Sequence, residues 1–161
     1  MTSAGAAALA LQDQAALWRM GEAGAADVVS SACAALVAGV DSPALRILAA
    51  CTRTEADYDV HDLLPPALDE LGLVLHPAGS RAAQEAGVRA LATRTLAGEL
   101  TPRELAFRVH GRFGHDFPLA ERLAALDDEY DYLEHGEDAA QVDADVLAEA
   151  RRITAAVRPV P

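Results

Sequence analysis

Residues 116–133 repeat their large apolar side chains at the spacing of an α-helix. The repeat has steps of four, three, four and three residues, and its members are Leu119, Leu123, Leu126, Tyr130 and Leu133. This spacing puts all five side chains on one stripe of a helix, which we expect to face the core. The same helix would then turn a negative face outward, formed by Asp127, Asp128, Asp131 and Glu134.

The rest of the chain also favours helices packed on helices. Alanine is the commonest residue, and only 4% of the residues are aromatic. Alanine is the best helix former, and its small side chain lets helices approach closely. We therefore predict an all-α fold, a single compact bundle of six to eight short to medium helices. The 161 residues suit one domain covering residues 1–161, with frayed tails at 1–8 and 158–161.

The clearest helix boundary lies at Thr101, where a capping box with Glu104 surrounds a proline in the first helical position. The other expected helices follow the apolar spacing and cover residues 9–20, 25–40, 43–51, 61–71, 80–97 and 140–157. Residues 52–60 are polar, and we expect a loop there. Pro65 and Pro66 should lie in the first turn of the next helix or delay its start, because interior prolines remove hydrogen-bond donors.

The formal net charge of −12 limits the classes of partner. Such a charge repels nucleic acids and anionic membrane surfaces, so neither is expected as a partner. It speeds the encounter with a positively charged protein, although solubility alone also explains it. The sequence carries no signal for the oligomeric state.

Two cysteines, Cys33 and Cys51, are too few for a disulfide scaffold, and both lie in apolar helical patterns. The N-terminus lacks the basic segment of a signal peptide, and no apolar stretch is long enough for a membrane span. A reduced, cytoplasmic protein without a cofactor is the expectation.

The strongest functional signal is the acidic run from Asp127 to Asp138, which holds seven carboxylates and no basic residue. Like charges three and four positions apart destabilise a helix, so such a face suits a cationic partner. Tyrosines within the run support an interface. The predicted partner-binding residues are Asp127, Asp128, Tyr130, Asp131, Tyr132, Glu134, Glu137 and Asp138. In charge and size the chain is similar to bacterial immunity proteins, which implies a non-enzymatic module that binds a basic protein.

Two His-Asp doublets support an alternative, enzymatic function. His61-Asp62 and His115-Asp116 resemble the pairs of HD phosphohydrolases, all-helical proteins that bind metal through histidines and aspartates. The resemblance implies a metal-dependent hydrolase with His61, His115 and Asp116 as ligands and Asp143 as the distant aspartate. Asp62 and Asp116 are also well placed as helix caps.

Two further histidines belong to patterns with ordinary explanations. His135 could join Asp128 and Asp131 in a cluster on one helix face, but a histidine is also favoured at the negative end of a helix dipole. His110 lies beside the apolar stripe of its helix, and we expect a partly buried histidine with a hydrogen-bond partner.

Gly39-Val-Asp-Ser42 resembles the attachment motif of acyl and peptidyl carrier proteins, in which the serine carries phosphopantetheine. Ser42 followed by Pro43 is equally typical of a helix N-terminus.

A longer resemblance spans Val40 to Tyr132. There the segments Asp-Ser-Pro-Ala-Leu-Arg, Gly-Glu-Leu-Thr-Pro and Asp-Glu-Tyr-Asp are similar to those of a group of uncharacterised actinobacterial all-helical proteins. This similarity implies an order of segments and no activity.

Overall fold

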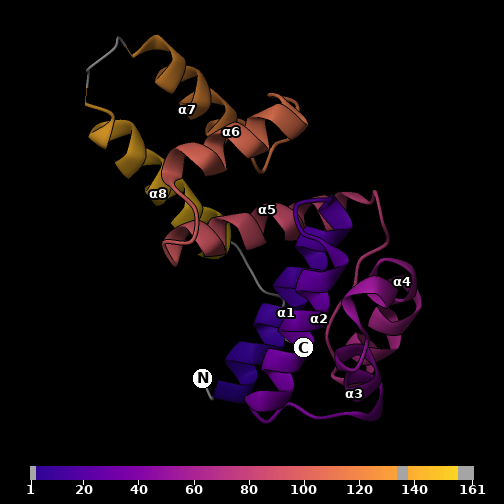
Figure 1. The fold of residues 1–161 in the computed structure, drawn as a ribbon. Coiled ribbons are helices and arrows are strands. Elements are labelled where there is room, and N and C mark those ends of the chain that lie inside the picture. The colour runs from indigo at the N-terminus through magenta and orange to yellow at the C-terminus, as the bar shows by residue number, and fades with distance from the viewer. Residues whose placement is uncertain (1–2, 134–137, 156–161) are drawn as a thin grey trace. The chain divides into compact units, whose positions relative to one another are not determined.

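The computed structural model describes residues 3–133 and 138–155. Over these residues the chain forms eight helices and no strand, which confirms the all-α prediction (Figure 1). The helices are α1 Ser3–Met20, α2 Ala25–Val37, α3 Pro43–Ala49, α4 Arg53–Glu70, α5 Arg81–Leu96, α6 Pro102–Phe113, α7 Glu121–Tyr132 and α8 Ala140–Ala155. They group into two compact units, residues 1–87 (unit 1) and 88–161 (unit 2), and α5 contributes to both. The single domain expected from the sequence stays a prediction.

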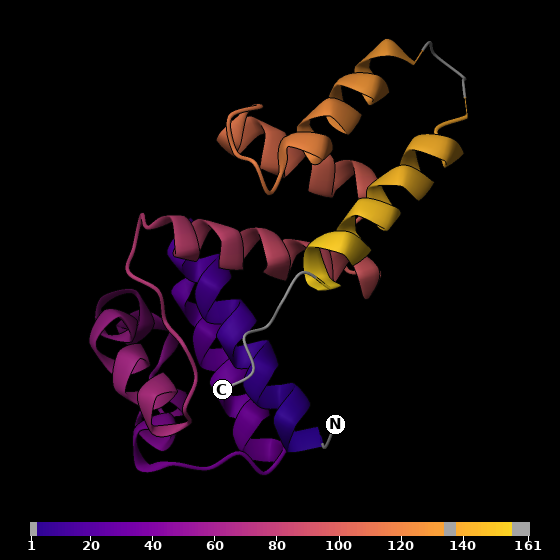
Figure 2. The ribbon, with the colours of Figure 1, turned by 180° about the vertical axis from the view of Figure 1, so that it is seen from behind.

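Unit 1 is built around α2, which packs against α1, α3 and α4. Figure 1 and the reverse view in Figure 2 both show α1 and α2 side by side. The core of unit 1 combines fully buried leucines with many alanines, among them Ala32, Ala35 and Ala67. The alanines allow the helix axes to approach closely, as the composition predicted.

The first helix begins earlier than the sequence analysis predicted. Residues 3–8 were expected to be frayed, but they form the first turns of α1. Ala4, Ala7 and Ala8 pack against the core of unit 1. This apolar contact, added to the high helix propensity of alanine, explains why the helix extends to Ser3. The expected tail at 158–161 lies outside the described residues.

The predicted loop at residues 52–60 is wrong, because α4 begins at Arg53. Thr52 caps it: its hydroxyl accepts the Glu55 N–H at 3.3 Å, and the Glu55 carboxylate accepts the Thr52 N–H at 2.9 Å. Pro65 and Pro66 lie inside the helix and leave two backbone carbonyls without their usual donors. One face of α4 is nevertheless buried throughout, and this burial holds the helix together across the prolines; its members are Ala56, Val60, Leu64, Ala67 and Leu68.

Unit 2 contains α6, α7 and α8, each of which packs against the other two. The capping box at the start of α6 is present as predicted, with Glu104 N–H donating to Thr101 Oγ1 at 3.2 Å. The apolar stripe of α7 also faces the core: Leu123, Leu126 and Tyr130 are buried. Asp116 does not cap this helix, which begins five residues later at Glu121.

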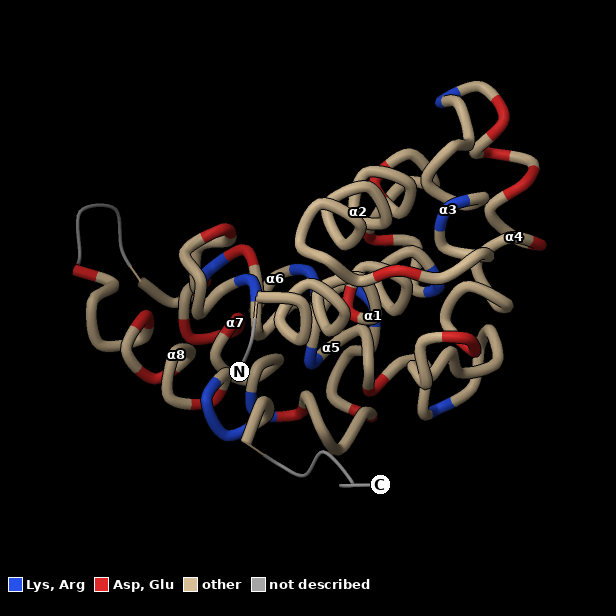
Figure 3. Tube along the Cα trace, turned by 90° about the horizontal axis from the view of Figure 1, so that it is seen from below, with Lys and Arg blue, Asp and Glu red and all other residues tan. Residues whose placement is uncertain are grey.

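Charged residues occur along the chain of both units (Figure 3). Acidic residues occur on α4 as well as on α7 and α8, so the negative charge is not confined to the predicted docking helix. No helix among the described residues combines the length and the apolar character that crossing a lipid bilayer requires.

Candidate functional site

Two histidines and two aspartates come together where α6 packs against α7. His110 lies in the last turn of α6, and His115 lies in the turn that follows it. Asp127 and Asp128 are consecutive residues of α7. The packing of the two helices therefore joins polar groups that are up to 18 positions apart in the chain.

The four side chains form a connected polar cluster. His110 Nδ1 lies 2.9 Å from Asp127 Oδ2 and 3.8 Å from Asp128 Oδ1. His115 Nε2 lies 3.2 Å from Asp128 Oδ2. The two imidazole rings meet edge to face, with their centroids 4.9 Å apart. One ligand atom from each of His110, His115 and Asp128 lies within 4.8 Å of the other two. This is the one such group of potential metal ligands found among the described residues.

The turn between α6 and α7 fixes the position of His115. Gly114 ends α6 with φ +58° and ψ −146°, a conformation that side chains with a Cβ rarely adopt. Its N–H donates to the His110 carbonyl at 2.8 Å. On either side of the turn, the rings of Phe113 and Phe117 stack with their centroids 4.5 Å apart, and Phe117 is buried. A glycine and an aromatic pair thus set the path that brings His115 to Asp128.

Replacing Gly114 by alanine is expected to destabilise unit 2 by about 1–3 kcal/mol, the usual cost of a strained backbone conformation. Gly111 provides a matched control inside α6, since a Cβ there meets open space and its φ is not positive. Gly111→Ala should stabilise the helix by up to about 1 kcal/mol. Urea unfolding followed by circular dichroism compares the two variants. Equal effects from both substitutions would contradict this account of the turn.

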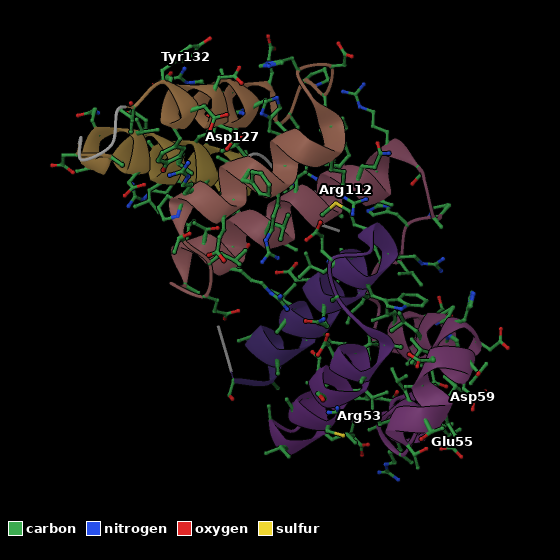
Figure 4. The ribbon with its side chains drawn as sticks, turned by 45° about the horizontal axis from the view of Figure 1, so that its top comes forward. Arg53, Glu55, Asp59, Arg112, Asp127 and Tyr132 are labelled. Atoms are coloured by element: carbon green, nitrogen blue, oxygen red, sulfur yellow. The ribbon has the colours of Figure 1, made fainter. Side chains whose placement is uncertain are left out.

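Asp127 does not lie on the outer face, so this part of the sequence prediction is wrong. Its side chain is only 10% exposed and forms the hydrogen bond with His110. In Figure 4, Asp127 lies on the side of α7 that faces the neighbouring helices, whereas Tyr132 points away from them. A carboxylate enclosed in this way is not available to a docking protein.

Tyr130 is also buried, and it too is unavailable as a docking residue. Its hydroxyl donates to the carboxylate of Asp143 on α8, and the guanidinium of Arg103 lies over its ring at 5.3 Å. Burial raises the pKa of Tyr130 well above its usual range, and the hydrogen bond to Asp143 acts in the same direction. The phenol therefore stays protonated and links α7 to α8.

The remaining predicted docking residues have different environments. Asp131 and Tyr132 are exposed, and Asp131 Oδ1 lies 4.0 Å from Arg103 Nη2. Asp138 is exposed and accepts the N–H of Ala140 at the start of α8. Glu134 and Glu137 lie outside the described residues, as does His135. Within the described residues, only a small part of the predicted partner-binding surface is therefore exposed.

The ligands expected for the alternative, HD-like metal site come from both units. His61 belongs to α4 of unit 1, where its ring meets the edge of Trp18 at 5.8 Å between centroids. His115 and Asp116 belong to the turn in unit 2, and Asp116 is exposed. Asp143 accepts the hydrogen bond from Tyr130. The combination of His61 with His115 stays a prediction.

Ser42 has the structural role of a helix cap. It is buried, and its hydroxyl accepts the Leu45 N–H at 3.2 Å. A serine that carries a phosphopantetheine arm must be reached by the enzyme that attaches the arm, so this environment favours the cap over the carrier function.

Sequence reasoning described His110 correctly as a partly buried histidine with a partner, but it did not identify that partner. The position of Asp127 held a signal: it lies four residues after Leu123 and three before Tyr130, within the angular range of the apolar stripe. No protein-family model, curated protein or solved structure matches the chain.

Proposed function

We propose that unit 2 binds a divalent first-row transition-metal ion through His110, His115 and Asp128. The observation that carries this proposal is the proximity of the three side chains, whose ligand atoms lie within 4.8 Å of one another. Two imidazoles and one carboxylate are a donor set that suits zinc, nickel, cobalt or ferrous iron. Magnesium and calcium prefer sites made of oxygen ligands, so they should bind this site weakly.

The spacing of one ligand pair already suits a metal ion. Ligands about 2.1 Å from a tetrahedral metal are about 3.4 Å apart, and at octahedral angles they are about 3.0 Å apart. His115 Nε2 and Asp128 Oδ2 are separated by 3.2 Å, between these two values. A cation could therefore replace the hydrogen bond between them with little movement of either side chain.

The site is accessible from solvent. The side chains of His115 and Asp128 are 52% and 42% exposed. Three protein donors leave at least one coordination position for water or another small ligand. The net charge of −12 favours the approach of a cation. These features support reversible binding from solution.

Calorimetric titration of the purified protein with zinc tests the proposal. We expect binding at one site per chain, and His115→Ala or Asp128→Ala should weaken it by more than about 100-fold, since each removes a direct ligand. His61→Ala is the matched control: it removes the same chemical group from unit 1 and should leave the affinity unchanged. Absence of zinc binding by the wild-type protein would refute the proposal. Weakening by His61→Ala, with no effect of Asp128→Ala, would favour the HD-like ligand set instead.

The sequence prediction of a protein-binding module remains a second proposal in a narrower form. The observation that favours it is Tyr132, whose side chain is 85% exposed beside the exposed carboxylate of Asp131. Tyrosine is enriched at interfaces, and an exposed carboxylate can meet a basic partner. Asp127 and Tyr130 take no part in this version, because both are buried.

Affinity capture from the native cell at increasing salt tests this second proposal. Binding through Asp131 should weaken steeply with ionic strength, because salt screens exposed charges beyond about 10 Å at 0.1 M. Asp131→Arg combined with Tyr132→Ala should abolish capture of the partner. Asp69→Arg, an exposed position on α4, should not. Capture that ignores both the salt and the α7 variant would exclude α7 as the docking surface.

A further inference from the structure

We infer that unit 2 holds a second site, an open pocket that binds a zwitterionic small molecule of the α-amino acid class. The pocket lies at the first turn of α7, beside α8, and its volume of about 420 Å³ is in the range of small-molecule sites. Its walls combine two cationic, two anionic and two apolar residues: Arg122, Arg152, Glu121, Glu149, Pro118 and Ala125. The proposed metal ligands are other residues, so the inference does not depend on the metal site.

The buried carboxylate of Glu149 holds the guanidinium of Arg152 in place at the pocket wall. Only 9% of the Glu149 side chain is exposed, and burying an unpaired carboxylate is costly. Arg152 compensates this charge with two hydrogen bonds, from Nε at 2.8 Å and from Nη2. Nη2 of Arg152 also donates to the Leu119 carbonyl at 3.3 Å. These contacts fix the guanidinium before any ligand arrives.

The two arginines keep hydrogen-bond donors for a ligand. A guanidinium carries five N–H groups, and the contacts of Arg152 within the described residues occupy only Nε and Nη2. The two hydrogens on Nη1 therefore remain. Arg122 donates from Nη1 to Glu129 at 3.2 Å, in a pair whose side chains are 52% and 45% exposed. Exposed pairs of this kind contribute little, so the carboxylate of a ligand can replace Glu129.

The charges of the pocket walls favour a zwitterion over a simple anion. Guanidinium donors suit a carboxylate group, and they are matched by the carboxylate of Glu121, which is exposed and has no side-chain partner among the described residues. An ammonium group beside the carboxylate of the ligand pairs with Glu121. A ligand without net charge also avoids the repulsion that a protein of net charge −12 exerts on anions. Pro118 and Ala125 offer an apolar surface to an aliphatic side chain.

Titration of the wild-type protein with L-leucine tests the inference, with the NMR signals of the arginine Nε–H groups as the readout. Metal ions are left out, because amino acids chelate them. The signals of Arg122 and Arg152 should shift and reach saturation. Two related compounds separate the contributions: 4-methylpentanoate lacks the ammonium group of leucine, and 3-methylbutylamine lacks its carboxylate. Each should bind at least about tenfold more weakly than leucine, since each loses a charge-assisted contact.

A pair of variants then locates the site. Arg122→Gln should weaken leucine binding by about tenfold or more. Arg151→Gln is the matched control, because Arg151 is exposed on α8 and lies outside the pocket walls, and it should leave the affinity unchanged. The inference is overturned if leucine causes no saturable shift up to its solubility limit, if 4-methylpentanoate binds as tightly as leucine, or if both variants weaken binding equally. The wild-type titrations give their answer whether or not a variant folds.

Discussion

Replacing Leu123 by alanine is expected to lower the free energy of unfolding of unit 2 by about 2–5 kcal/mol. Leu123 has no exposed surface and belongs to α7, which packs against both α6 and α8. The substitution removes three buried carbon atoms and leaves a cavity that close-packed neighbours fill only in part. The loss is a large fraction of the stability of an ordinary domain.

Tyr132→Ala on the same helix is the control for this prediction. Its side chain is 85% exposed, so the change in stability should stay within about 0.5 kcal/mol. Urea unfolding followed by far-ultraviolet circular dichroism measures both variants. Similar shifts of the unfolding midpoint for Leu123→Ala and Tyr132→Ala would show that the stripe of α7 is not the core of unit 2.

The second large effect is stabilisation by zinc. A ligand that binds only the folded protein stabilises it by about 2.7 kcal/mol when its free concentration is 100 times the dissociation constant. His110, His115 and Asp128 are assembled by the packing of α6 on α7, so an unfolded chain does not hold them together. Zinc should therefore raise the midpoint of thermal unfolding of the wild-type protein, and magnesium should not.

Variants locate the origin of this stabilisation. His115→Ala should remove it, because the variant lacks a ligand, whereas His61→Ala should keep it. A zinc effect of equal size in wild-type protein and His115→Ala would mean that the metal binds elsewhere on the chain. The comparison uses all 161 residues, so it requires no assumption about how either unit folds alone.

The sequence predicted the helices well where their amphipathic pattern was strong. The capping box at Thr101 and the stripe of Leu123, Leu126 and Tyr130 needed only local spacing to be recognised. The start of α4 was missed because its first two turns are polar and its prolines argued for a later beginning. Burial of one apolar face along the whole of α4 stabilises this helix in spite of its polar first turns and its prolines. A short window of sequence does not contain this information.

The candidate site was harder to predict for a related reason. His115 and Asp128 appeared among the candidates, but in different hypotheses, because nothing in their spacing places them in contact. The approach of His110 to Asp127 depends on how α6 crosses α7, and this angle is set by packing. Counting the carboxylates of α7 together also gave no information about the different directions in which their side chains point. Asp127 follows the apolar stripe into the protein, and Asp128 does not.

The Gly114 turn, with its stacked Phe113 and Phe117 rings, has a consequence for how a bound ion would be detected. A cation that arrives here finds its imidazoles already in place, so loading the site requires no new backbone structure. Far-ultraviolet signals should therefore stay flat during a titration, while the resonances of the two rings shift. Exchange of the ion should then be limited by the departure of water and ligand atoms rather than by any rearrangement of the polypeptide.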